Sequence, residues 1–190
     1  MPQPLTPAVA ELDVRQLSAM STFPPPPKRY SAEIIRSDGE RSLVFEDGVR
    51  GRVEDGKNIL IRRLDKGVAW NLTPETKTYS QVKLTKEMVK RAISLETLCD
   101  WRADGTEVID GRNCLRFIGH YHSADGASDA AHEIYYVDAK THMPRRNITF
   151  DLNGKKALTV DTLNVVLGPQ PREIFEIPAG YKRGYRRKAP

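Results

Sequence analysis

Residues 29–57 read RYSAEIIRSDGERSLVFEDGVRGRVEDGK, and this stretch decides the fold. The dipeptide Asp-Gly occurs in it three times, at Asp38-Gly39, Asp47-Gly48 and Asp55-Gly56. Asp-Gly between alternating apolar residues is the strongest local signal for a two-residue β-hairpin turn. The segments around these turns therefore predict the strands of an up-and-down antiparallel meander.

The same alternation continues along most of the chain. Clusters of Gly, Pro, Asp or Asn predict further turns at residues 65–67, 73–76, 110–111 and 153–154. The strands that we expect between the turns span residues 29–37, 41–46, 49–54, 58–64, 68–72, 79–84, 106–109, 112–122, 131–137, 145–152 and 157–167.

Two segments depart from the strand pattern. Residues 7–20 have apolar side chains at loosely helical spacing, and the four prolines at 24–27 that follow predict a stiff, extended spacer. Thr85 is a suitable N-cap for a helix over residues 86–98, because the apolar side chains after it share one helical face.

These elements predict a mainly β (α+β) fold. A sheet of about ten twisted strands tends to curl. We therefore expect a curled antiparallel sheet, or incomplete β-barrel, covered by one or two helices. Residues 29–183 would form this half-barrel domain. Residues 1–28 would form an N-terminal helix and Pro-rich linker, and residues 184–190 a basic C-terminal tail.

A curled sheet covered by helices encloses an apolar cavity, which is a physical route to binding an apolar ligand. Val68, Trp70 and Leu72 share one face of their strand, because side chains alternate with a period of two. The candidates for lining the cavity are the inward-facing apolar residues Ile59, Ile61, Val68, Trp70, Leu72, Tyr79, Phe117 and Phe150. The alternative is that the same residues fill a solid core. Trp101, between Asp100 and Arg102, is expected to be half exposed in a polar link.

Length and composition set limits on the function. The chain has 190 residues, 39% of them hydrophobic, and a formal net charge of +5, which fits one domain. No apolar run approaches the roughly 18 residues of a membrane-spanning helix. The densest basic cluster is residues 182–188, which form either a solvated terminus or a contact for phosphate groups.

The motifs of common enzymes are missing from the sequence. It has no G-x-S-x-G, no P-loop and no G-x-G-x-x-G, so we expect no enzyme, no catalytic residues and no cofactor. His120, His122 and His132 lack a Cys or carboxylate ligand at fixed spacing, which favours surface histidines over a metal site. Arginines alternate with acidic residues in the strands, which favours a solvated sheet face over a nucleic-acid platform.

Three stretches together resemble the LolA-like superfamily of envelope proteins. They are RLDKGVAW at 63–70, NLTPETKTY at 71–79 and IFEIPAGY at 174–181. The superfamily includes bacterial outer-membrane lipoprotein carriers and periplasmic proteins of unknown function, and the resemblance is closer to the latter. It implies an incomplete β-barrel closed by helices, a cavity for acyl chains and a periplasmic location after removal of a signal peptide that is absent from this chain.

The prediction for function is a periplasmic binding or carrier protein for an amphiphile. The partner would be a lipid or a lipid-modified protein held in the apolar cavity. The alternative is an envelope protein-interaction or sensor module, with a filled core and another envelope protein as its partner. No nucleic acid is expected as a partner. In an oxidising periplasm, Cys99 and Cys114 are candidates for a disulfide that would connect the inserted helix to the sheet.

Overall fold

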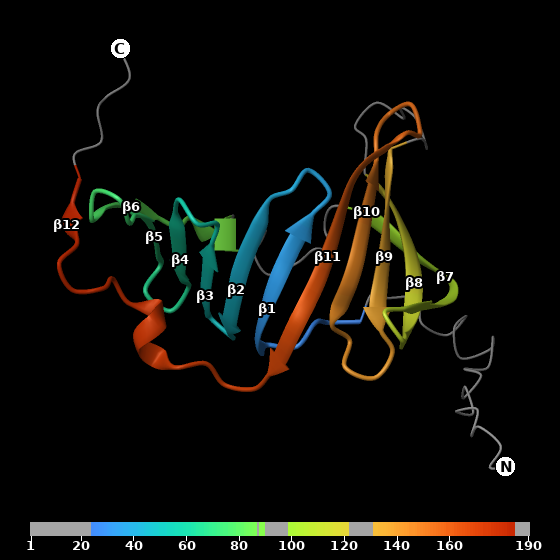
Figure 1. Ribbon diagram of the computed structural model, residues 1–190, viewed down its shortest axis with the longest axis horizontal. Coiled ribbons are helices and arrows are strands. Elements are labelled where there is room, and N and C mark those ends of the chain that lie inside the picture. The colour runs from blue at the N-terminus through green and yellow to red at the C-terminus, as the bar shows by residue number, and fades with distance from the viewer. Residues whose placement is uncertain (1–23, 87, 90–98, 122–130, 185–190) are drawn as a thin grey trace, which may run out of the picture.

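The structure is a computed structural model, which describes residues 24–86, 88, 89, 99–121 and 131–184. It consists of one mainly antiparallel sheet of twelve strands (Figure 1). The strands are β1 (Arg29–Arg36), β2 (Arg41–Asp47), β3 (Arg50–Glu54), β4 (Ile59–Arg63), β5 (Val68–Thr73), β6 (Thr78–Lys83), β7 (Cys99–Ile109), β8 (Arg112–Tyr121), β9 (His132–Asp138), β10 (Pro144–Phe150), β11 (Lys156–Leu167) and β12 (Lys182–Arg183).

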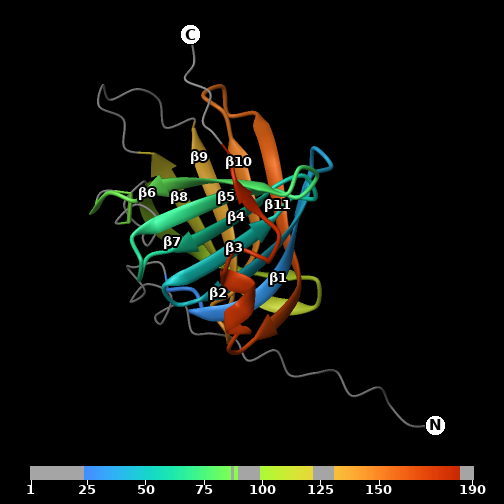
Figure 2. The ribbon, with the colours of Figure 1, turned by 90° about the vertical axis from the view of Figure 1, so that its left-hand side faces the viewer.

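The sheet consists of two meanders that meet at its centre. Its order is β12-β6-β5-β4-β3-β2-β1-β11-β10-β9-β8-β7, so the first strand pairs with the eleventh. The connection after β6 leads from one side of the sheet to the opposite edge, where β7 begins. The sheet is not closed into a barrel, because β7 and β12 lie at opposite edges. Seen from its side, strands β3–β6 cross the direction of β9–β11, which shows the strong twist (Figure 2).

The predicted hairpins explain most of this topology. Gly39, Gly48 and Gly56 have φ angles of 94°, 69° and 85°, the left-handed conformation that Asp-Gly turns require. β7 begins at Cys99 and is therefore longer than the strand expected at 106–109. Sequence reasoning missed its first half because polar residues such as Asp100 and Arg102 hide the strand pattern there. The two-residue β12, parallel to β6, was also missed.

The expected cover of one or two helices is not found in the part of the chain that the structure describes. A helical turn does begin at Thr85, whose Oγ1 accepts a hydrogen bond from Met88 N at 3.2 Å. The rest of that predicted helix, residues 90–98, and the helix predicted at 7–20 lie outside the described residues. What covers the sheet instead is a C-terminal segment, residues 172–181, which includes the 3-10 helix η2 (Arg172–Phe175).

The two faces of strands β2–β5 differ in their cover. We call the side that contacts the C-terminal segment the Phe175 face; it carries Ile61, Trp70 and Leu72, which pack against Phe175. The opposite side is the Leu60 face, on which Val44, Val53 and Leu60 are paired across neighbouring strands. The sheet thus buries one face of these strands under its own chain and leaves side chains of the other face accessible.

Candidate ligand-binding surface

The predicted lining residues of strands β4–β6 come together on the Phe175 face. Ile61, Leu72 and Phe175 are all 0% exposed. Because these three side chains have no accessible surface, they form a filled core at this place. Six predicted residues belong to this cluster: Ile61, Trp70 and Leu72 are buried, and Ile59, Val68 and Tyr79 are partly buried against them.

Arginines of β3 and β4 hold the C-terminal segment on this face. Arg52 Nη1 donates a hydrogen bond to the carbonyl oxygen of Ile174 at 2.8 Å. The buried Arg63 donates to the Phe175 carbonyl and is paired with both Asp65 and Glu176. The Arg63 guanidinium holds the pKa of Asp65 below its ordinary value through their hydrogen bonds. The segment is therefore fixed by ionic contacts as well as by burial of Phe175.

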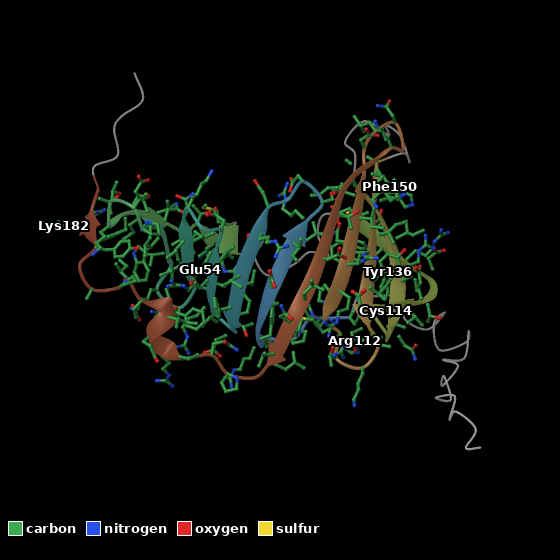
Figure 3. The ribbon with its side chains drawn as sticks, in the orientation of Figure 1. Glu54, Arg112, Cys114, Tyr136, Phe150 and Lys182 are labelled. Carbon is green, nitrogen blue, oxygen red and sulfur yellow. The ribbon has the colours of Figure 1, made fainter. Side chains whose placement is uncertain are left out.

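Phe117 and Phe150 lie away from that cluster, in the β7–β11 half of the sheet. Phe117 is 1% exposed and packs with Leu115 and Val137 on the Leu60 face. Phe150 is on the Phe175 face, near Ile134, and stacks on His132 with ring centroids 4.4 Å apart. Figure 3 shows Phe150 far from Glu54, which belongs to the other half. The eight predicted residues thus belong to three clusters and do not line one cavity.

A hollow is present on the Leu60 face. It has a volume of about 450 Å³ and is lined by Val53, Asp55, Asn58, Leu60 and Asn71. Leu60 is 41% exposed, although it lies in mid-strand between two half-buried or buried neighbours. A volume of this size is within the range of small-molecule sites. None of the predicted lining residues contributes to it. Those of β4–β6 point to the opposite side of the sheet, and Phe117 and Phe150 lie in the other half, on β8 and β10.

A row of apolar side chains leads into this hollow. Ala32, Val44, Val53 and Leu60 are successive cross-strand partners from β1 to β4, and Asn71 continues the row on β5. Cross-strand partners are about 5 Å apart and point to the same face, so the row forms a continuous apolar strip. The strip ends in polar side chains at the hollow, where Asp55 accepts hydrogen bonds from the backbone of Lys57 and Asn58.

An ion pair crosses the sheet beside this strip. Arg62 Nη2 of β4 donates to both carboxylate oxygens of Glu46 in β2, at 2.8 and 3.0 Å. The strand between them presents Gly51, at which a Cβ atom would stand 2.9 Å from Arg62 Nη2 and from Glu46 Oε1. Burial raises the pKa of Glu46. Burial and the neighbouring Glu46 raise the pKa of Tyr30 to about 12. Sequence reasoning did not find this pair, because its members are sixteen residues apart.

Trp101 is positioned by a glycine of the adjacent strand. It pairs with Gly119, and a Cβ atom there would lie 2.5–2.7 Å from three atoms of the indole ring. The ring also meets Tyr135 edge to face, with centroids 5.1 Å apart. Trp101 is half-buried against the Phe117 cluster. The expected polar link is in fact a strand, and its tryptophan extends the Leu60 face.

The predicted disulfide is wrong. Both cysteines are free and buried. Cys99 of β7 pairs with Tyr121 of β8, seven positions along that strand from Cys114. At about 3.3 Å per residue this separates them by roughly 23 Å, far beyond the 4.4–6.8 Å between Cα atoms of a disulfide. Sequence proximity misled the prediction because the chain between them is a hairpin of two long strands.

No group of three metal-ligating residues is found among the described residues. His120 and His132 are cross-strand partners with ring centroids 5.8 Å apart, whereas His122 lies outside the described residues. Several strand arginines pair with acidic neighbours, as Arg50 does with Asp47 and Arg146 with Asp161. Within the described ranges, no helix has the length and apolar character needed to cross a bilayer.

Two of the solved structures with a similar fold are those of bacterial proteins. An uncharacterised conserved protein from Thermus thermophilus is matched with a TM-score of 0.60 and 14% identity, over 91% of this chain and 97% of that one. MucB in the MucA/MucB complex of Pseudomonas aeruginosa is matched with a TM-score of 0.52 and 13% identity, over 88% of this chain. This chain spans only 60% of MucB. Protein-family models and the sequences of curated proteins give no match.

The matches also include the superfamily that the sequence resembles. A LolA superfamily protein from Nitrosomonas europaea is matched at 12% identity, over 85% of this chain and 94% of that one, with a TM-score of 0.36. Solved LolA superfamily structures are thus among those similar to this chain, as predicted. At this TM-score the likeness adds nothing to the fold assignment, which rests on the Thermus thermophilus and MucB structures.

Proposed function

We propose that this chain is a periplasmic binding or carrier protein for an amphiphile, whose acyl chain lies on the Leu60 face. The observation that supports this most directly is the hollow of about 450 Å³ at the end of the apolar strip. Beyond the buried Ala32, the strip leads from Val44 to Leu60 across three strands, which offers an accessible apolar surface. A flexible acyl chain matches such a surface, because burying it removes apolar area from water at about 25 cal/mol per Å².

The test compares two matched leucines on opposite faces. Leu60 and Leu43 are 41% and 46% exposed, on the Leu60 face and the Phe175 face respectively. The L60E and L43E variants are titrated calorimetrically with a single-chain phospholipid below its micelle concentration. L60E is expected to lose binding by at least tenfold, because a carboxylate would have to be desolvated under the acyl chain. L43E is expected to bind like the unmodified protein.

Native mass spectrometry of detergent-free protein adds a second readout. A lipid adduct that L43E retains and L60E loses is the expected result. Absence of any adduct, together with no calorimetric binding by the unmodified protein, would overturn the proposed function.

A second candidate is an envelope protein-interaction module. The observation in its favour is β7, an edge strand of eleven residues that, within the described part of the sheet, is hydrogen-bonded to β8 on one side only. Such an edge can accept a further strand from another protein. MucB, which has the same fold, is in complex with MucA in its solved structure. This candidate becomes the stronger one if the lipid titrations show no binding.

A further inference from the structure

The Leu60 face carries equal and opposite charges beside its apolar strip. Arg62 lies next to Leu60 on the same face of β4, and its partner Glu46 lies next to Val44 on β2. Their side chains are 29% and 19% exposed, so both remain partly accessible. The Arg62 Nε atom is buried and has no hydrogen-bond partner among the described residues. A buried donor without an acceptor costs about 1–3 kcal/mol, and a shift of the partly exposed Arg62 side chain would let this donor meet an acceptor of a bound molecule.

The geometry of the pair points to a particular headgroup. A guanidinium with a spare donor binds phosphate oxygens in a planar, charge-assisted arrangement. The Glu46 carboxylate beside it would repel a purely anionic headgroup but attract an ammonium group. A headgroup with a phosphate and an ammonium has one charge for each partner.

We propose that the Glu46–Arg62 pair selects an amphiphile with a zwitterionic phosphate–ammonium headgroup, the phosphate on Arg62 and the ammonium on Glu46. The proposal rests on the proposed function, since the acyl chain of the same molecule occupies the apolar strip. Gly51 makes the arrangement possible, because a side chain at that position would stand between the two charged groups.

The experiment measures headgroup preference at constant acyl chain. Lysophosphatidylethanolamine, lysophosphatidylglycerol and an alkylammonium with the same chain length are titrated below their micelle concentrations, with soluble phosphoethanolamine as the chain-free control. We expect the unmodified protein to bind the zwitterionic lipid about tenfold or more tightly than the other two, which is the loss expected from one charge-assisted hydrogen bond. Phosphoethanolamine alone is expected to give no binding at the same concentrations.

Two variants then separate the roles of the charges. R62Q should weaken lysophosphatidylethanolamine about tenfold and make the alkylammonium the better ligand. E46Q should instead make the anionic lipid the better ligand. G51A keeps both charges but forces the two side chains apart, so the preference for the zwitterionic lipid should fall while thermal unfolding stays close to that of the unmodified protein.

R41Q is the matched control, because Arg41 pairs with Glu33 at 3.4 Å on the opposite face of β1 and β2. It should leave the preference unchanged. Equal affinity for all three lipids in the unmodified protein would overturn the headgroup proposal and leave the proposed function standing. A headgroup preference that neither E46Q nor R62Q alters would also overturn the headgroup proposal. No binding of any lipid would overturn the proposed function itself.

Discussion

Both faces of strands β3–β5 carry apolar side chains, but only one of the two faces is covered by another segment of the chain. On the Phe175 face, Ile61 and Leu72 are completely buried under residues that follow them by more than a hundred positions. On the Leu60 face, Leu60 remains 41% exposed beside a hollow. The difference shows that apolar alternation identifies strands and their more apolar face, but does not tell what covers that face or how accessible the other face remains. That is decided by where a distant segment of chain packs.

The variant with the largest expected effect on the difference between the two faces removes the Phe175 side chain. Its side chain is 0% exposed and fills the centre of the cluster. F175A is expected to lower the free energy of unfolding by about 3–5 kcal/mol, the usual cost of deleting a buried aromatic ring. Urea unfolding measures it. L60A on the other face should cost less than about 1 kcal/mol, since Leu60 is already partly exposed. Equal losses in the two variants would contradict the distinction between the faces.

A smaller effect is expected from the packing of Trp101 on the Leu60 face. G119A would place a Cβ atom 2.5–2.7 Å from the indole ring, so the ring or the edge strand must move. We expect a loss of about 1–3 kcal/mol, as for other overpacked sites. A red-shifted Trp101 emission, measured in a W70F background, should accompany it. The control is G51A, whose close neighbours are the ends of flexible side chains; a loss as large as that of G119A would contradict this explanation.

The ionic contacts of the Phe175 face should contribute less than its buried ring. R63Q removes the pairing of a buried guanidinium with Asp65 and Glu176 and is expected to cost about 1–2 kcal/mol at neutral pH, discounted because both carboxylates are partly exposed. R41Q, in an exposed pair, should change stability by less than about 0.5 kcal/mol.

The effect of R63Q should depend on pH in a defined direction. Arg63 lowers the pKa of Asp65 in the folded protein. The stability from this pair is therefore fully present above the unfolded pKa of about 4 and is lost as pH falls through the depressed folded value. Thermal unfolding from about pH 7 to about pH 2 should show the unmodified protein and R63Q converging at low pH. A gap that stays constant would contradict the role of Asp65.

The smallest expected effect concerns the cysteines, one on each face of the β7–β8 hairpin. Because Cys99 and Cys114 are not bridged, adding a reductant should leave the melting temperature unchanged. Burial, helped by nearby acidic groups, raises the pKa of Cys99 to about 11 and raises that of Cys114. The folded protein should therefore react slowly with iodoacetamide at about pH 8, and both thiols should react quickly in urea. A melting temperature that falls when reductant is added would instead support a disulfide between Cys99 and Cys114.

The sequence by itself determined the strands and their local order. The Asp-Gly turns at 38–39, 47–48 and 55–56 each formed the expected hairpin. They could be predicted because the conformation of a tight turn depends only on the few residues that form it. The N-cap role of Thr85 was predicted for the same reason, since its hydrogen bond to Met88 N joins close neighbours. The resemblance to the LolA-like superfamily also lay in short stretches around turns.

Only the tertiary structure decided which face is covered and what is brought beside it. Phe175 packs against Ile61, which precedes it by more than a hundred residues. Glu46 of β2 is paired with Arg62 of β4 across the intervening strand β3. Alternation in β4 assigns Ile59 and Ile61 to one face and Leu60 and Arg62 to the other, but it does not say which distant segment packs on the isoleucine face. That segment is residues 172–181, whose position depends on contacts that no local pattern of residues encodes.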